Sequence, residues 1–215
     1  MTTGAGPSLT PCQQAALAKV ACACRLPGGV AVLCGPRGVG TSLVLARLAQ
    51  HVADEGRGIE HRPIHDWETV IADDRRPLPD VLVADDAHLA GPDVLASLVD
   101  RCRRGRPAAA VVLAGQGRLL TLLARDSRLE SAVTLRATLR PCSLDESRTI
   151  VAALARTAMF DDAALDAIHE IAAGIPAAVR RLVALADIVA GTRRDPRVAA
   201  GDLEEIHRRL SPLAA

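Results

Sequence analysis

Aromatic side chains are nearly absent from this sequence. Its 215 residues include one Phe, one Trp and no Tyr, although hydrophobic residues make up 49% of the chain. Alanine, valine and leucine must therefore build the hydrophobic core, which a chain of this length can make sizeable. The shortage also removes the aromatic stacking platforms that proteins use to bind single-stranded nucleic acid.

Lysine is equally scarce, because Lys19 is the only lysine among 26 basic residues and the other 25 are arginines. The 25 acidic residues nearly balance the basic ones and leave a net charge of +1. A balanced chain has no global electrostatic attraction for nucleic acid. The arginines at 101–106 have two interpretations. They are either the ordinary solvated end of a helix or a patch that binds DNA or an acidic partner. The net charge of the chain does not indicate DNA.

The sequence also lacks the patterns of membrane, secreted and zinc-binding proteins. No apolar run approaches the ~20 residues that a membrane helix needs. The first residues show no charged-then-apolar signal pattern, and the six cysteines form no C-x-x-C pair or zinc-like spacing. We therefore expect reduced, mostly buried thiols in a cytoplasmic protein without membrane insertion.

What the sequence does contain is a glycine-rich loop, "GPRGVGTS", at residues 35–42. Phosphate-binding loops follow the pattern G-x-x-x-x-G-K-[ST], and the loop departs from it only at the lysine position. Successive backbone N–H groups of such a loop, with the positive end of the next helix, attract phosphate without help from the lysine. The alternative is an ordinary strand-to-helix turn. The residues predicted to bind nucleotide are Gly35, Pro36, Arg37, Gly38, Val39, Gly40, Thr41 and Ser42.

Polar residues follow two further apolar runs that read as strands. "VLVADDAH" ends in Asp85 and Asp86, and Gln116 follows "AAAVVLAG". Residues at the carboxyl ends of parallel strands face the ligand crevice of a sheet. We therefore predict Asp85, Asp86 and Gln116 as catalytic residues, with Asp85 and the Ser42 hydroxyl as ligands of Mg²⁺. The alternatives are an acidic pair that caps a turn and a loop glutamine that faces solvent.

The chain divides into three parts by composition. Residues 1–8 form a flexible tail rich in small residues. From 9 to 141, apolar strands alternate with helices, which predicts an α/β core whose parallel sheet is covered on both faces. From 142 to 215 the pattern is purely helical and predicts a small subdomain of about four helices, opened by a capping box at Ser143 and Glu146.

With these motifs the chain resembles the AAA+ ATPases of the secretion-associated and transposition-helper type. The resemblance runs from about Leu9 to about Ile188 and rests on the loop, "LVADDAHL", "VVLAGQGRL" and "LDAIHEIAAGIPAAVRRLVALA". It implies a P-loop NTPase sheet of five parallel strands in the order 5-1-4-3-2, with a C-terminal helical lid. It also implies ATP or ADP with Mg²⁺ as cofactors, and either a protein partner or further copies of the chain.

The sequence departs from the pattern of these ATPases at charged positions. Thr41 replaces the loop lysine, Asp86 the glutamate, Ala132 the arginine finger and Ala177 the lid arginine. An arginine finger by itself contributes ~10³–10⁵ in rate. We therefore expect a degenerate nucleotide-binding protein with weak or no hydrolysis that acts as a regulatory or scaffolding subunit.

Two alternatives stay open. One is an active ATPase that drives assembly or DNA transactions, in which Arg37 or a neighbour's arginine replaces the lysine. The other is a partner-binding module that has lost nucleotide. Outside the motifs, His88 lies beside Asp85 and Asp86, so contact with the site is one interpretation, but a surface or capping role is favoured. Trp67 either packs a loop or marks a partner contact.

Overall fold

The computed structural model describes residues 8–73, 76–105 and 108–210. The chain divides into two compact units, a first unit of Met1–Arg140 and a second unit of Pro141–Ala215. None of the helices in the described ranges is both long and apolar enough to cross a membrane.

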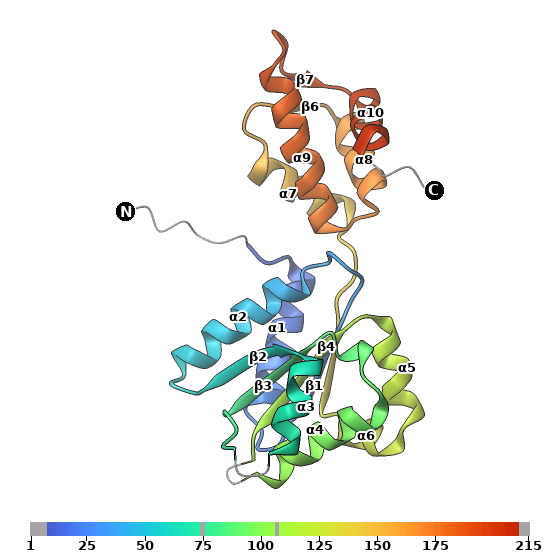
Figure 1. The fold of residues 1–215 in the computed structure, drawn as a ribbon. Helices are drawn as coiled ribbons and strands as arrows, with labels where there is room; N and C mark the ends of the chain where they lie inside the picture. The colour runs from blue at the N-terminus through green and yellow to red at the C-terminus, as the bar shows by residue number, and fades with distance from the viewer. Residues whose placement is uncertain (1–7, 74–75, 106–107, 211–215) are drawn as a thin grey trace. The chain divides into compact units, whose positions relative to one another are not determined.

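The first unit is built on a five-stranded sheet (Figure 1). All neighbouring strands pair in parallel, and the order is β2-β3-β4-β1-β5. Read from the other edge this is 5-1-4-3-2, so the predicted order is confirmed. The strands are β1 (Val30–Cys34), β2 (Ile59–Pro63), β3 (Val81–Asp85), β4 (Ala110–Gly115) and β5 (Leu135–Thr138).

Helices cover both faces of this sheet (Figure 1). Successive strand residues point to opposite faces, so Val32 and Leu33 enter two different cores. One core contains α1 (Pro11–Cys24) and α2 (Thr41–Asp54). The other contains α3 (Ile64–Ala72), the short 3₁₀ helix η1 (Ala87–Leu89), α4 (Pro92–Arg104), α5 (Gly117–Arg125) and α6 (Ser127–Ala132).

The first helix begins at a capping box. The backbone N–H of Gln13 donates to the Thr10 hydroxyl, and the Gln13 side chain accepts from the Thr10 N–H. Pro11 occupies the first helical turn, where its missing N–H costs nothing. Lys19 is an exposed residue further along the same helix.

The described part of segment 57–79 contains β2 and α3. Trp67 on α3 is fully buried, and its Nε1–H donates to the carbonyl oxygen of Val83 at 3.1 Å. Trp67 therefore belongs to the core of the first unit and not to its surface.

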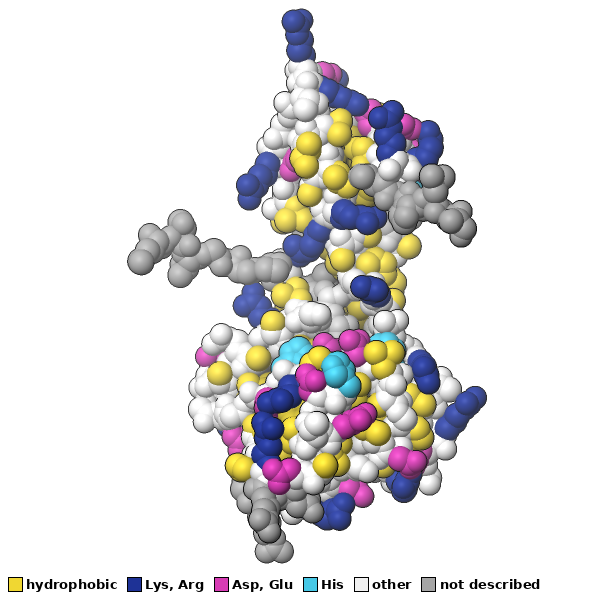
Figure 2. All heavy atoms as spheres, in the orientation of Figure 1, with side chains coloured by type: hydrophobic (Ala, Val, Ile, Leu, Met, Phe, Trp, Pro, Cys, Tyr) yellow, Lys and Arg dark blue, Asp and Glu magenta, His cyan; other side chains and the backbone are white. Residues whose placement is uncertain are grey.

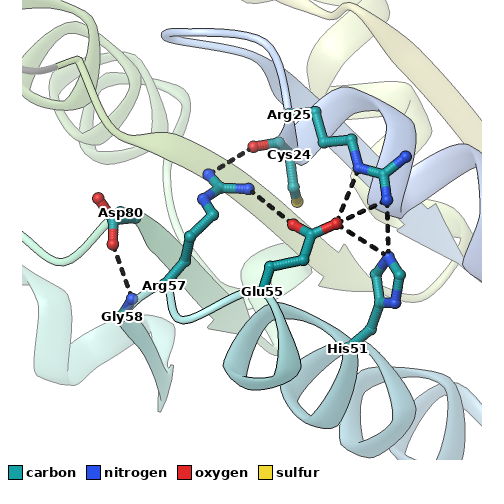
Figure 3. A network of polar contacts seen from close by, with 7 residues as sticks. All are labelled: Cys24, Arg25, His51, Glu55, Arg57, Gly58 and Asp80. Atoms are coloured by element: carbon teal, nitrogen blue, oxygen red, sulfur yellow. Dashed lines mark hydrogen bonds and ion pairs between the residues drawn. The ribbon is translucent and has the colours of Figure 1, made fainter.

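An ionic network joins the ends of α1 and α2 near the amino-terminal edge of the sheet (Figure 3). Arg25 Nη2 lies 2.6 Å from Glu55 Oε1, and Arg57 donates to the Cys24 carbonyl at 2.7 Å. The hydrogen bond from Arg25 lowers the pKa of Glu55. No disulfide joins the six cysteines, all of which lie within the described residues. Burial raises the pKa of the Cys24 thiol to about 12, so this thiol stays neutral.

Over residues 141–210, the second unit contains four helices and a small strand pair. The helices are α7 (Leu144–Leu154), α8 (Asp162–Ala172), α9 (Pro176–Gly191) and α10 (Ala200–Leu210). The capping box predicted at Ser143 and Glu146 is confirmed. The expectation of a purely helical region is wrong, because β6 (Met159–Phe160) pairs in parallel with β7 (Arg197–Val198). Two residues per strand are too few to show a period in the sequence.

Asp187 on α9 holds the loop before β6. Its carboxylate accepts backbone N–H bonds from Arg156, Thr157 and Ala158, the shortest being 2.8 Å from Ala158. Burial alone would raise the pKa of Asp187, but these N–H groups outweigh it and lower the pKa. The charged carboxylate is therefore the form that stabilises this loop.

We predict that Asp187→Asn lowers the free energy of unfolding of the second unit by about 1 kcal/mol near pH 7, because an amide oxygen accepts more weakly than a carboxylate. A depressed pKa contributes stability above the unfolded pKa and loses it as pH falls through the folded pKa. The difference between the two proteins should therefore shrink as the pH falls below the ordinary carboxyl range and vanish once Asp187 is protonated in the folded protein. Urea titrations followed by helical circular dichroism measure it. Fluorescence of Trp67, in the first unit, should report the same transition in both proteins.

Candidate nucleotide-binding site

The residues predicted to bind nucleotide and metal come from three neighbouring strands of the first unit. The loop 35–40 follows β1, Asp85 ends β3, and Gln116 follows β4. Cys34 pairs with Gly115, and Ala84 with Leu113, so these strand ends lie at one edge of the sheet. The structure thus brings the loop, the acidic pair and Gln116 to the same edge, where parallel sheets bind ligands.

The loop packs closely where it leaves the sheet. Gly35 is buried and donates its N–H to the Gly115 carbonyl at 3.2 Å. A Cβ atom on Gly35 would lie 2.6 Å from Val39 Cγ1 and 2.9 Å from Leu139 Cβ, so only glycine fits. Gly40 has a φ of +104°, a backbone conformation that other residues rarely adopt.

The loop offers unused N–H groups to an anion. Within the described ranges, the backbone N–H groups of Gly38, Gly40, Thr41 and Ser42 donate to no protein acceptor. Thr41 and Ser42 form the first turn of α2, whose end carries partial positive charge. Polar N–H groups clustered in this way fit a phosphate group.

Asp85 is held as a carboxylate. Its Oδ2 lies 3.2 Å from Nε2 of His61 on β2, and its Oδ1 accepts the N–H of Asp86 at 2.8 Å. The hydrogen bond from His61, followed by that from Asp86, lowers the pKa of Asp85. An ionised, half-exposed carboxylate with a hydroxyl residue, Ser42, at the same sheet edge fits a hard cation such as Mg²⁺. The role of His61 was not apparent from the sequence, because its partner lies on another strand.

Asp86 and Gln116 are exposed at the same edge. Asp86 has a φ of +52°, which turns the chain from β3 into η1. Gln116 stands at the start of α5, and its side chain makes no cap hydrogen bond there. Both side chains are thus available to solvent or to a ligand.

The structure corrects the expectation for His88. This residue was expected at the surface or in a cap, but it is buried, with 8% of its surface exposed. The turn at Asp86 folds η1 over the end of β4, where a Cβ atom on Gly115 would lie 2.9 Å from His88 Nδ1. Among the described residues His88 Nδ1 has no hydrogen-bond partner, and the nearest acid, Asp86 Oδ1, lies 4.0 Å away. The surface assignment is therefore wrong.

Two alanines, Ala132 and Ala177, occupy the positions at which the resemblance to AAA+ ATPases implies arginines. Arg128, near Ala132, pairs with Asp126 at 2.7 Å and with Asp93 at 3.1 Å, and these bonds raise its pKa. Ala177 is exposed on α9 of the second unit.

The arginine cluster at 101–106 is partly engaged within the first unit. Arg101 Nη2 donates to the Arg76 carbonyl at 2.9 Å, while Arg106 lies outside the described residues. On the visible surface of the first unit, histidine and acidic side chains gather together, whereas basic side chains are spread over both units (Figure 2).

Gln13 is a site residue that sequence reasoning missed. This buried side chain of α1 donates from Nε2 to the Val39 carbonyl at 2.9 Å and thus contacts the loop directly. Its capping box with Thr10 could be read from the sequence, but its contact 26 residues away could not.

Comparison with solved structures identifies the fold. No family model and no curated protein matches the sequence. The Thermotoga maritima RuvB Holliday junction branch migration motor is 18% identical, with a TM-score of 0.63 over 92% of this chain and 69% of that one. The Aeropyrum pernix ORC1 protein, solved with DNA, is 17% identical, with a TM-score of 0.68 over 95% of this chain and 66% of that one.

The chain has the fold of the AAA+ P-loop ATPases. A third AAA+ structure, of Hsp104 with ATPγS and FITC casein, is 15% identical with a TM-score of 0.64. The alignment covers 93% of this chain but only 42% of Hsp104. At these identities the likeness to AAA+ proteins is one of fold.

We predict that Gly40→Ala lowers the free energy of unfolding by about 1–3 kcal/mol, because it forces a non-glycine residue into a left-handed conformation. Its Cβ would also lie 2.2 Å from Gln13 Nε2. Gly117→Ala is the matched control, because a Cβ there meets nothing within 4 Å. Urea denaturation followed by Trp67 fluorescence compares the two, and equal stabilities would contradict the close packing of the loop.

Proposed function

We propose that this chain is an AAA+-type protein that binds ATP or ADP with Mg²⁺ through the loop 35–42, hydrolyses ATP weakly or not at all, and acts as a regulatory or scaffolding subunit. One observation carries the proposal. The loop keeps its unused backbone N–H groups and its helix end, while the position of the charged lysine holds Thr41. Phosphate binding depends mainly on the backbone N–H groups, whereas catalysis depends mainly on fixed side-chain charge.

Backbone groups can hold the phosphates by themselves. The N–H groups of Gly38 and Gly40 and the start of α2 would bind the phosphate oxygens. Asp85 and Ser42 are the residues that would hold Mg²⁺, which when bound supplies positive charge at the phosphates. None of these contributions requires a lysine.

Catalysis needs fixed charge where negative charge develops. Thr41, Ala132 and Ala177 are uncharged where AAA+ ATPases carry cations, and Arg128 is held by two aspartates. Asp86 would orient the attacking water, and its carboxylate is one methylene shorter than glutamate. Gln116 would contact the terminal phosphate or the water. We therefore propose retained binding with impaired turnover.

The partner is proposed from the resemblance. AAA+ proteins of the secretion-associated and transposition-helper type work beside other proteins, so we propose a protein partner or further copies of this chain in the cytoplasm. Two of the solved neighbours are described as a branch migration motor and as a DNA complex. DNA is therefore retained as a partner to test, although the charge of this chain is balanced.

We predict that Thr41→Lys strengthens binding of Mg²⁺-ATP by about ten- to a hundredfold, the effect of one charge-assisted hydrogen bond. Thr41→Gln is the control, because it adds length without charge. Calorimetry with Mg²⁺ measures the affinities. No binding by the wild type would refute the proposed function, whereas equal affinities of wild type and Thr41→Lys would refute the charge argument for this position.

Arg37 supports a second candidate, an active ATPase with a divergent site. Its side chain is exposed on the loop and forms no ion pair with the residues that the structure describes. An unpaired guanidinium there could supply the missing charge from another direction.

If the second candidate is correct, Arg37→Ala should abolish wild-type phosphate release, because no other cation on the loop remains. Arg104→Ala, which removes an exposed arginine of α4 that pairs only weakly with Asp100, is the control. Phosphate release near background in the wild type would leave the proposal of impaired hydrolysis standing and refute the active ATPase.

A further inference from the structure

Gln13 is a buried polar side chain with both ends of its amide in use. It is 4% exposed. Its Oε1 accepts the backbone N–H of Thr10 at 2.9 Å, and its Nε2 donates to the backbone carbonyl of Val39 at 2.9 Å. One side chain thus connects the start of α1 to the glycine-rich loop.

The bond to Val39 fixes the orientation of a peptide group. In a trans peptide the C=O of one residue and the N–H of the next point in opposite directions. Since the Val39 carbonyl points at Gln13, the N–H of Gly40 points away from α1. Among the described residues this N–H has no protein acceptor, so it is one of the groups available to an anion.

Gly40 makes room for the amide. A Cβ atom there would lie 2.2 Å from Gln13 Nε2 and 3.2 Å from its Cδ. The glycine at this position therefore serves two purposes, since it allows the φ of +104° and lets the Gln13 side chain reach the loop. The Val39–Gly40 peptide turns about Val39 ψ and Gly40 φ, and glycine restricts φ least of all residues. The bond from Gln13 is therefore the contact that fixes the direction of the Val39 carbonyl.

We propose that Gln13 is a positioning residue, which holds the Val39–Gly40 peptide so that the Gly40 N–H faces the phosphate site. This inference rests on the proposed nucleotide binding by the loop. It also couples the loop to the start of α1, because the same amide closes the capping box with Thr10. In a site that lacks the lysine, the affinity for phosphate depends on the orientation of these N–H groups.

Two substitutions separate positioning from helix capping. Gln13→Glu keeps an oxygen acceptor for the Thr10 N–H, and glutamate is as suitable as glutamine in a capping box, but it loses the donor to Val39. Gln13→Met keeps the length without a charge and loses both bonds, so it serves if the buried carboxylate prevents folding. Gln14→Met is the control, because Gln14 is the next residue of the same helix and is exposed. Its side chain donates to the Leu9 carbonyl and not to the loop.

The first measurement needs no ligand. In the wild type the backbone ¹⁵N order parameter of Gly40 should be about 0.85, and in either Gln13 variant it should fall below about 0.6. The values for β1 and β4 should not change, and Gln14→Met should match the wild type. An order parameter of Gly40 that stays at the wild-type value in a folded Gln13 variant would overturn the proposal.

The second measurement separates phosphate from base recognition. The Gln13 variants should bind Mg²⁺-ATP and inorganic diphosphate about five- to tenfold more weakly, the effect of one hydrogen bond, and should bind adenosine as the wild type does. Equal losses for diphosphate and adenosine would indicate a general structural role and overturn the proposal. If the wild type binds neither ATP nor diphosphate, the proposed function fails, and the order parameter of Gly40 still decides whether Gln13 fixes the loop.

Discussion

The parallel pairing of β1 with β4 is the contact on which the candidate site depends. It places the loop beside Gln116, and the pairing of β4 with β3 places Asp85 at the same edge. The chain can leave β1 there only because Gly35 has no side chain, since Val39 and Leu139 fill the space that a Cβ would need. The loop therefore depends on the sheet for its position and on its glycines for its shape.

Backbone dipoles and side-chain charges contribute to this site in different ways. Peptide dipoles and helix ends are properties of the backbone and persist for as long as the fold does. Side-chain charges can be lost one at a time, and Thr41, Ala132 and Ala177 carry no charge. The proposed combination of retained nucleotide binding and impaired turnover rests on this difference between backbone and side-chain contributions.

Local patterns in the sequence predicted most of the fold, and long-range contacts account for what they missed. Apolar runs that alternate with helices predicted the parallel sheet, and glycine spacing predicted the loop. The pair β6–β7 is too short to show a period. The burial of His88 follows from a left-handed turn at Asp86, and the role of Gln13 depends on Val39, 26 residues away. Neither contact leaves a signal among neighbouring residues.

The scarcity of lysine has a chemical consequence for α1. Lys19 is the chain's only ε-amine, is exposed, and lies on the helix that also carries Gln13. Any chemistry directed at lysine side chains, whether an acetyl transfer or an amine-reactive label, therefore has one side chain to act on. A label attached to Lys19 would lie on α1, the helix whose Gln13 side chain bonds to the loop.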